Sequence, residues 1–206
     1  MMLAQFVLFD GFDPLDAIAP YEVLGASAAL GAGAAFEVEL VSAEGARLVP
    51  SGLPGISLRA AGPVDADRAD LVVVPGAVAL TEDDVRRVFG AALATPLAGA
   101  LAAAVRREGV VVATVCGGSV LLGLAGLLAG RTATTNTGAL ELLGGLGARA
   151  VDARVADDGD LVTASGVTSG LDLGLHLLDR YLGADAALAA ERLFHHERRG
   201  TPWTAR

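Results

Sequence analysis

The stretch VVATVCGGSVLLGLAGLLAG, residues 111–130, decides the fold and contains the only cysteine of the chain. A β-branched apolar run ends at Cys116, two glycines follow, and an apolar segment with helical spacing begins. A continuous Val-rich run is typical of a strand that is buried on both faces, as in a parallel sheet. The pattern therefore predicts a strand, a tight turn at Cys116 and a helix behind it.

The same alternation of apolar runs and helical segments extends along the chain in both directions. Buried strands are predicted over 5–10, 36–42, 70–76, 109–116 and 131–135. Helices are predicted over 14–30 (ending at Gly31), 81–93, 96–109, 118–130, 137–147, 169–183 and 184–200, and a hairpin around Asp158-Gly159 over 153–166. Alternating strands and helices indicate a single α/β domain over 1–206, with a doubly wound, mostly parallel sheet sandwiched by helices.

The composition excludes several classes of protein. A hydrophobic share of 53% with 19% charged residues rules out disorder, and a net charge of −9 argues against binding to nucleic acid. One cysteine can form no internal disulfide, which fits a reducing compartment. The most apolar stretch, 109–130, is interrupted at Cys-Gly-Gly, so no membrane span is expected. These features favour a soluble cytoplasmic protein.

Cys116 lies where chemistry gathers in such sheets, just beyond the carboxyl end of a strand. A helix that begins near residue 117 would point its free N–H groups at the sulfur, lower the pKa of the thiol and favour the thiolate. A free cysteine is also commonly a small buried apolar residue. The residues alone leave both interpretations open.

Two further loops reach the same edge of the sheet. In GFDPLDAIAPYEVLG (11–25), Asp13 precedes Pro14 and is interpreted as a helix cap, whereas Asp16 lies past the cap among apolar residues. Asp16 is therefore either a helix-start residue or a buried carboxyl with a raised pKa. After the strand at 70–76, the amides of Gly76 and Ala77 either bind a developing oxyanion or belong to a plain strand-ending turn.

Four motifs together resemble the ThiJ/PfpI superfamily. They are LDAIAP (15–20), VVVPGA (72–77), ATVCGGSVLLGLAGLLAGRTATT (113–135) and LVTASGVTSGLDLGLHLL (161–178). The resemblance implies a flavodoxin-like, class I glutamine amidotransferase-like fold and, within the superfamily, is strongest to the isocyanide (isonitrile) hydratases. It implies that Cys116 is the nucleophile, on a nucleophile elbow, and that Asp16 is the acid/base. Backbone amides of Gly76, Ala77 and Gly117 would bind the oxyanion or substrate.

The chain departs from the superfamily pattern at two positions. Gly117 stands where protease-like members have His and hydratases commonly have Thr, and Asn136 stands where glyoxalase and deglycase members have His. Without an imidazole beside the thiol, protonation of a leaving amine is difficult, so protease activity is not expected. His176, His195 and His196 fall on later helices, where packing or solvent-facing roles are expected.

The resemblance thus implies a lyase of the hydratase type, which converts an isocyanide and water to an N-substituted formamide without metal or cofactor. A glyoxalase- or deglycase-like enzyme acting on 2-oxoaldehydes is one alternative, and a redox-responsive or ligand-binding protein is another. The pocket walls are expected to come from 11–25, 76–82 and 135–140. These segments have small apolar side chains and few charges, which favours a small uncharged or weakly polar substrate. The resemblance also implies a homodimer. Trp203 either docks on the body or on the partner subunit, or belongs to a frayed tail.

Overall fold

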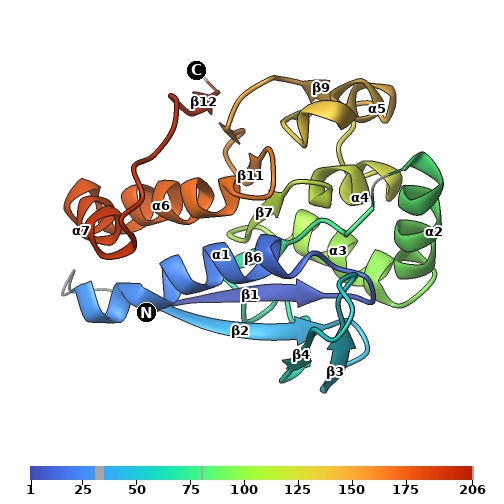
Figure 1. Cartoon of the computed structure of the whole chain (residues 1–206), viewed down its shortest axis with the longest axis horizontal. Coiled ribbons are helices and arrows are strands. Elements are labelled where there is room, and N and C mark those ends of the chain that lie inside the picture. Colours follow the sequence, from blue (N-terminus) through green and yellow to red (C-terminus); the bar gives the residue numbers. More distant parts are fainter. Residues whose placement is uncertain (31–34, 80, 206) are drawn as a thin grey trace.

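The computed structural model describes residues 1–30, 35–79 and 81–205. An eight-stranded sheet forms its centre, with helices on both faces (Figure 1). Across the sheet the strands are β12 (Trp203–Thr204), β10 (Val155–Asp157), β11 (Leu161–Ala164), β7 (Val111–Val115), β6 (Leu71–Val74), β1 (Met2–Leu8), β2 (Phe36–Ser42) and β5 (Gly62–Pro63). Six neighbouring strands run parallel to one another: β11, β7, β6, β1, β2 and β5. Strands β10 and β12 run in the opposite direction. The predicted mostly parallel α/β sandwich is confirmed.

Two helical layers cover the sheet. One contains α1 (Pro14–Gly25), α6 (Ser169–Leu182) and α7 (Ala184–Phe194); the other contains α2 (Glu82–Leu93), α3 (Leu97–Arg106), α4 (Gly118–Leu124) and α5 (Leu140–Gly145). Each face of the sheet packs against its helical layer to form a hydrophobic core, and strand β6 contributes side chains to both. Leu71 and Val73 pack on the α1 side, while Val72 and Val74 pack on the α2 side. This period of two, with both sets apolar, is what a sheet covered on both faces requires.

Helix α1 is held tightly against α6. A Cβ on Gly174 would lie 2.7 Å from Val23 Cβ, and one on Gly170 would lie 2.9 Å from Pro20 Cδ. The two glycines therefore permit a helix approach that any side chain would prevent. Because α1 follows β1 at the carboxyl edge of the sheet, this packing also fixes the position of Asp16.

The strand predicted over 131–135 is shorter in the structure and lies outside the main sheet. Only Thr132–Ala133 (β8) is extended, and it pairs with β9 (Arg149–Ala150) outside the main sheet. The next two residues are held by side-chain hydrogen bonds instead: Thr134 N–H donates to Thr163 Oγ1, and Thr135 Oγ1 donates to the Cys116 carbonyl. Hydroxyl groups have thus replaced the sheet ladder in this segment.

Several helices are shorter than predicted. Helix α1 ends at Gly25 and a 3-10 helix (Ala26–Leu30) follows, while the predicted end at Gly31 lies outside the described residues. Helix α4 ends at Leu124, and α5 is preceded by a 3-10 turn at Thr137–Ala139.

Helix α7 ends at Phe194 instead of residue 200, because His195 adopts a left-handed conformation with φ of 48°. The chain then leaves the helix and returns to the sheet as β12, which pairs with β10. Trp203 lies in this edge strand, so the tail docks on the body of the protein (Figure 1).

The sequence-based prediction missed the short strands β5, β9 and β12 and one hairpin. Strands β3 (Arg47–Pro50) and β4 (Ser57–Ala60) form an antiparallel hairpin beside β2. Elsewhere, the hairpin predicted around Asp158-Gly159 is confirmed by the antiparallel β10–β11 pair. Within the described ranges, no single helix is long and apolar enough to span a membrane; α2 and α3 reach that composition only as a pair bent by 80°.

Candidate active site

The single cysteine occupies a sharp turn between a strand and a helix. Strand β7 ends at Val115, Cys116 has a φ of 54°, and α4 begins at Gly118. A positive φ is unfavourable for a residue with a side chain, so the surroundings must hold it. The Cys116 N–H donates to Ala164 O at 3.0 Å, and its carbonyl accepts from Thr135 Oγ1 at 2.8 Å.

A buried hydrogen-bond network of Thr114, Ser119 and Thr134 supports this turn. Ser119 Oγ donates to Thr134 O at 2.7 Å, so its contact of 2.6 Å with Thr114 Oγ1 uses the Thr114 proton. All three residues are fully buried. The network joins β7, the first turn of α4 and the segment after β8, and it fixes the angle at which Cys116 leaves the strand.

Gly118 is the glycine that this turn requires most strictly. A Cβ at this position would overlap the backbone carbonyl oxygen of Val74, which cannot move without disrupting β6. We expect Gly118→Ala to lower the free energy of unfolding by about 1–3 kcal/mol, as overpacking does, in urea titrations followed by circular dichroism. The matched control is Gly144→Ala, since Gly144 in α5 has open space around it, and alanine is the better helix former by about 1 kcal/mol. Equal stability losses in the two variants would contradict this account of the turn.

Asp16 lies in the first turn of α1 and is 0% exposed. Its Oδ2 accepts a hydrogen bond of 2.9 Å from the Gly76 N–H. Its Oδ1 is buried and has no hydrogen-bond partner among the described residues. An unpaired buried oxygen is costly, so it marks a place where a proton, a water molecule or a ligand is expected.

The carboxyl of Asp16 is strongly perturbed. Burial raises its pKa to about 8, the negative charge of Asp13 adds to that rise, and the Gly76 N–H opposes it. Asp13 also caps the helix as predicted, since its Oδ1 accepts from the Leu15 N–H. A pKa near 8 means that Asp16 is protonated at neutral pH. Of the two interpretations left open by the sequence, the buried carboxyl with a raised pKa agrees with the structure.

The expectation of a thiolate at Cys116 is not met in the resting protein. Burial raises the pKa of this thiol to about 12, and the neighbouring Asp16 raises it further, while the Gly117 N–H and the Asn136 side chain lower it. Helix α4 is only seven residues long, and its N–H groups do not offset the loss of water around a half-buried sulfur. The site therefore holds two protons at neutral pH, one on sulfur and one on the carboxyl.

Three backbone amides were predicted to bind an oxyanion or substrate, and the structure brings all three residues to the site. The Gly76 N–H is engaged by Asp16, and the Gly117 N–H faces the sulfur. Of these three amides, the Ala77 N–H is the one that has no hydrogen-bond partner among the described residues. A Cβ on Gly76 would lie 2.8 Å from Asp16 Oδ2 and 2.6 Å from the Gly117 nitrogen, so this glycine lets the acid approach the thiol turn closely.

A cavity of about 370 Å³ opens beside the thiol, between α2 and the α4–α5 region. Cys116, Gly117 and Asn136 form part of its wall. The other described residues that line it have mainly small or apolar side chains: Ala77, Ala79, Thr81, Glu82, Val85, Phe89, Val120, Gly138, Ala139 and Leu142. This volume is within the range of small-molecule sites. Segments 76–82 and 135–140 contribute to the wall as predicted, whereas no residue of 11–25 lines the cavity, so that part of the prediction is wrong. Asp16 is instead buried beside Gly76 and Gly117.

Two residues of this cavity, Asn136 and Phe89, were not assigned a role from the sequence. Asn136 Oδ1 accepts from the Gly138 N–H at 3.1 Å, which leaves its amide nitrogen to donate to the Cys116 sulfur. Phe89 from α2 contacts the turn from the opposite side, and the amphipathic pattern of 82–93 places it in the core without indicating which loop it meets. The one sequence feature that indicated a role for Asn136 was its position directly after Thr134 and Thr135.

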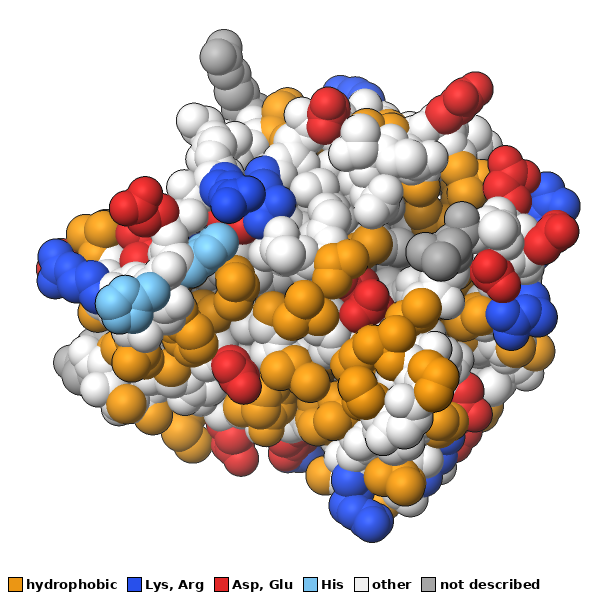
Figure 2. All heavy atoms as spheres, viewed as in Figure 1, with side chains coloured by type: hydrophobic (Ala, Val, Ile, Leu, Met, Phe, Trp, Pro, Cys, Tyr) orange, Lys and Arg blue, Asp and Glu red, His pale blue; other side chains and the backbone are white. Residues whose placement is uncertain are grey.

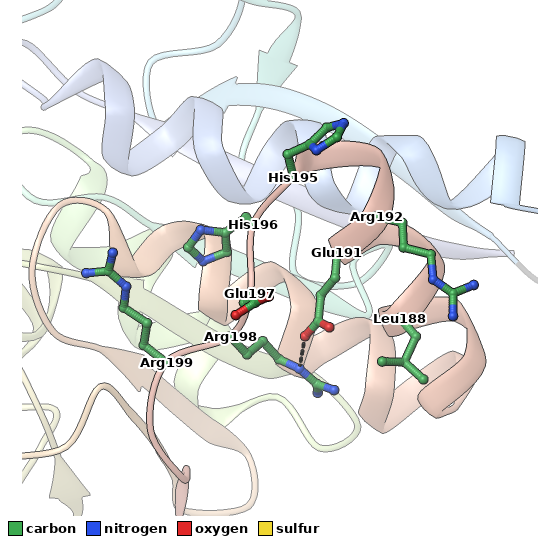
Figure 3. Close-up of a pocket in the computed structure, with 8 residues that line it drawn as sticks. All are labelled: Leu188, Glu191, Arg192, His195, His196, Glu197, Arg198 and Arg199. Atoms are coloured by element: carbon green, nitrogen blue, oxygen red, sulfur yellow. Dashed lines mark hydrogen bonds and ion pairs between the residues drawn. The ribbon is translucent and has the colours of Figure 1, made fainter.

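The histidines lie away from the thiol. His176 Nε2 contacts Asp157 Oδ2 at 2.8 Å, a packing role of the kind expected. His195 and His196 line a surface hollow of about 720 Å³ between the end of α7 and the tail that follows (Figure 3). Charged side chains pair within it, as in the 2.6 Å contact of Arg198 with Glu191. The hollow contains none of the predicted site residues.

The fold and the site define an α/β sandwich with a thiol and a buried carboxyl at the carboxyl edge of its sheet. The DJ-1/PfpI family profile matches residues 2–180. The isonitrile hydratase of Pseudomonas putida is 34% identical over 187 residues, which cover 88% of this chain and 73% of that protein. The chain therefore belongs to the DJ-1/PfpI family, as the motifs at Asp16 and Cys116 implied.

Solved structures agree on the fold. DJ-1beta of Drosophila melanogaster has a TM-score of 0.78 at 18% identity, and the alignment covers 95% of this chain and 98% of that one. A ThiJ/PfpI family protein from Pseudomonas syringae has a TM-score of 0.77 at 24% identity, covering 97% and 76%. At these identities the similarity extends to the fold alone.

Proposed function

We propose that the protein is a cysteine-dependent lyase that adds water to an isocyanide and releases an N-substituted formamide. The observation that carries this proposal is Asp16: fully buried, with one oxygen held by the Gly76 N–H and the other unpartnered, next to the only thiol. The 34% identity to an isonitrile hydratase supports the same reaction class. Cys116 is the proposed nucleophile, on a nucleophile elbow, and Asp16 is the proposed acid/base.

The first step uses both protons of the resting site. The terminal carbon of an isocyanide accepts a proton and a nucleophile at the same atom. Asp16 gives its proton to that carbon, the Cys116 sulfur bonds to it, and the thiol proton passes to the Asp16 carboxylate. The product is a thioimidate, Cys–S–CH=N–R, and Asp16 is again protonated. Donation by Gly117 N–H and Asn136 to sulfur stabilises the negative charge that develops there.

The second step returns the enzyme to its starting state. Asp16 protonates the thioimidate nitrogen and takes a proton from the attacking water, which forms a tetrahedral centre that bears sulfur, hydroxyl and N–H. The carbon–sulfur bond then breaks, the hydroxyl proton passes through Asp16 to sulfur, and R–NH–CHO leaves. A carboxyl with a pKa of about 8 can both give and take a proton near neutral pH. The Ala77 amide is the proposed donor to the oxygen of the product.

The test of this function is product analysis after incubation with tert-butyl isocyanide, phenyl isocyanide and, separately, methylglyoxal. We expect formamides from the isocyanides, with one ¹⁸O atom when the reaction runs in ¹⁸O-labelled water, detected by mass spectrometry. Lactate from methylglyoxal with no formamide would instead support the 2-oxoaldehyde alternative. No product from any of these substrates, with rapid stoichiometric oxidation of the thiol by dilute peroxide, would favour a redox-responsive protein.

We further propose a homodimer in the cytoplasm, with residues 1–206 acting as one domain. Figure 2 shows hydrophobic side chains spread across the face that carries α1 and the β3–β4 hairpin. Exposed members on these elements and the adjoining turn include Leu15, Leu48, Leu53 and Ile56. Contiguous apolar surface of this kind favours protein association. Light scattering after gel filtration measures the mass directly.

A further inference from the structure

The ring of Phe89 closes the cavity beside Cys116. Phe89 is 2% exposed and packs edge to face against Phe9, with 6.1 Å between ring centroids. Its helix, α2, is fixed at its start by Thr81, whose Oγ1 accepts from the Asp84 N–H at 3.1 Å. The ring is therefore a buried, packed part of the cavity wall.

The tip of this ring occupies the space where a side chain at position 117 would lie. A Cβ on Gly117 would be 3.0 Å from Phe89 Cζ and 3.5 Å from Cε2. The backbone of Gly117 has φ of −66° and ψ of −6°, which any residue can adopt. The ring, and not the backbone, is what requires glycine here.

The remainder of the cavity shows what kind of group it accepts. Val85, Val120 and Leu142 provide apolar walls behind the reactive end. Among the described residues that line it, Glu82 is the only charged side chain, and it is paired with Arg86 at 3.3 Å. An anionic substituent would find no cation there, so an uncharged apolar group is favoured.

We propose that Phe89 is a specificity-determining residue which, with Gly117, limits the N-substituent next to the reacting carbon to one compact, uncharged apolar group. The inference rests on the proposed function for the identity of the reacting group. The size limit itself follows from the contact between the ring and Gly117. Bulky bicyclic substituents are excluded because they meet the ring before their reactive end reaches sulfur.

The test compares tert-butyl and 1-naphthyl isocyanides in the wild type and in Phe89→Leu. We expect Phe89→Leu to raise kcat/KM for the naphthyl compound relative to the tert-butyl compound by at least about tenfold, the scale on which pockets discriminate apolar groups. The change should lie mainly in KM. Isothermal titration with N-tert-butylformamide and N-(1-naphthyl)formamide, which needs no turnover, should show the same shift in relative affinity toward the naphthyl compound.

The matched control is Phe9→Leu, which removes the same ring atoms from the neighbouring buried phenylalanine that does not line the cavity. It should leave the size ranking unchanged. Gly117→Ala approaches the contact from the other side and should weaken binding of both formamides, with recovery when combined with Phe89→Leu. An unchanged ratio between the two compounds in Phe89→Leu would overturn the inference even if isocyanides are hydrated. A shift of relative binding toward the naphthyl formamide, with no isocyanide turnover in any variant, would leave the inference standing and overturn the proposed function.

Discussion

Replacing Cys116 with alanine or serine is expected to remove isocyanide hydration, lowering kcat by at least about 10³-fold, because no other described residue that lines the cavity carries a thiol. Alanine has no nucleophilic atom, and a serine hydroxyl is a much weaker nucleophile than sulfur. Turnover is measured by formamide release, and intact-mass spectrometry of the wild type during turnover should show the mass of one added isocyanide.

The fold should survive this change. The backbone of Cys116 is held by the Ala164 carbonyl and by Thr135, and neither contact involves the sulfur. The urea midpoints of both variants should therefore remain close to that of the wild type. A Cys116→Ala protein that hydrates isocyanides at the wild-type rate would end the covalent scheme.

Asp16→Asn is expected to lower kcat by about 10²–10⁴-fold, the usual contribution of general acid–base catalysis. Asparagine can keep the hydrogen bond from the Gly76 N–H, but it has no acidic proton to give to the isocyanide carbon. The matched control is Asp13→Asn, which changes the neighbouring carboxyl in the same way and retains a helix-capping side chain. Asp13→Asn should still turn over substrate. Activity should fall as the pH rises through the pKa of Asp16, and in Asp13→Asn this fall should occur at lower pH, because the charge of Asp13 helps to raise that pKa.

Asp16→Asn is also expected to change how the stability of the protein depends on pH. Burial raises the pKa of Asp16 in the folded protein from 3.8 to about 8, so between these values the folded state binds a proton that the unfolded state lacks. Stability from this group is full below pH 3.8 and is lost as the pH rises to about 8. Relative to the wild type, Asp16→Asn should gain about 1.4 kcal/mol per pH unit across this window and level off above it. Urea unfolding at a series of pH values measures this gain, and a pH-independent difference would contradict the raised pKa.

Much of the fold was predictable because buried parallel strands leave a strong signal. Strands β2, β6 and β7 coincide with Val-rich runs, and β2 has the predicted bounds of 36–42. The strand predicted over 131–135 is shorter in the structure because threonines in an extended sequence can satisfy their backbone through hydroxyl groups on other segments. The end of α7 was missed because His195, and not a glycine, adopts the left-handed conformation. Neither effect is visible in local periodicity.

The candidate site was predictable in its parts but not in its electrostatics. The positions of Cys116, Asp16 and Gly76 at three strand ends follow from the topology of a parallel sheet. The protonation of the thiol does not, since it depends on how much water the completed cavity excludes and on a neighbouring acid. Phe89 was beyond prediction for a related reason: the pattern of α2 indicates which face is buried, but not that its ring reaches Gly117.

The proposed hydration requires that the Asp16 carboxyl carries a proton beside the thiol at neutral pH. The most direct measurement is its own titration, followed by ¹³C NMR of protein labelled at the aspartate side-chain carboxyl carbons, with the Asp16 resonance assigned by its absence from Asp16→Asn. We expect a midpoint near pH 8, because burial raises the pKa of this carboxyl. A midpoint near pH 4, the ordinary value for aspartate, would contradict this expectation.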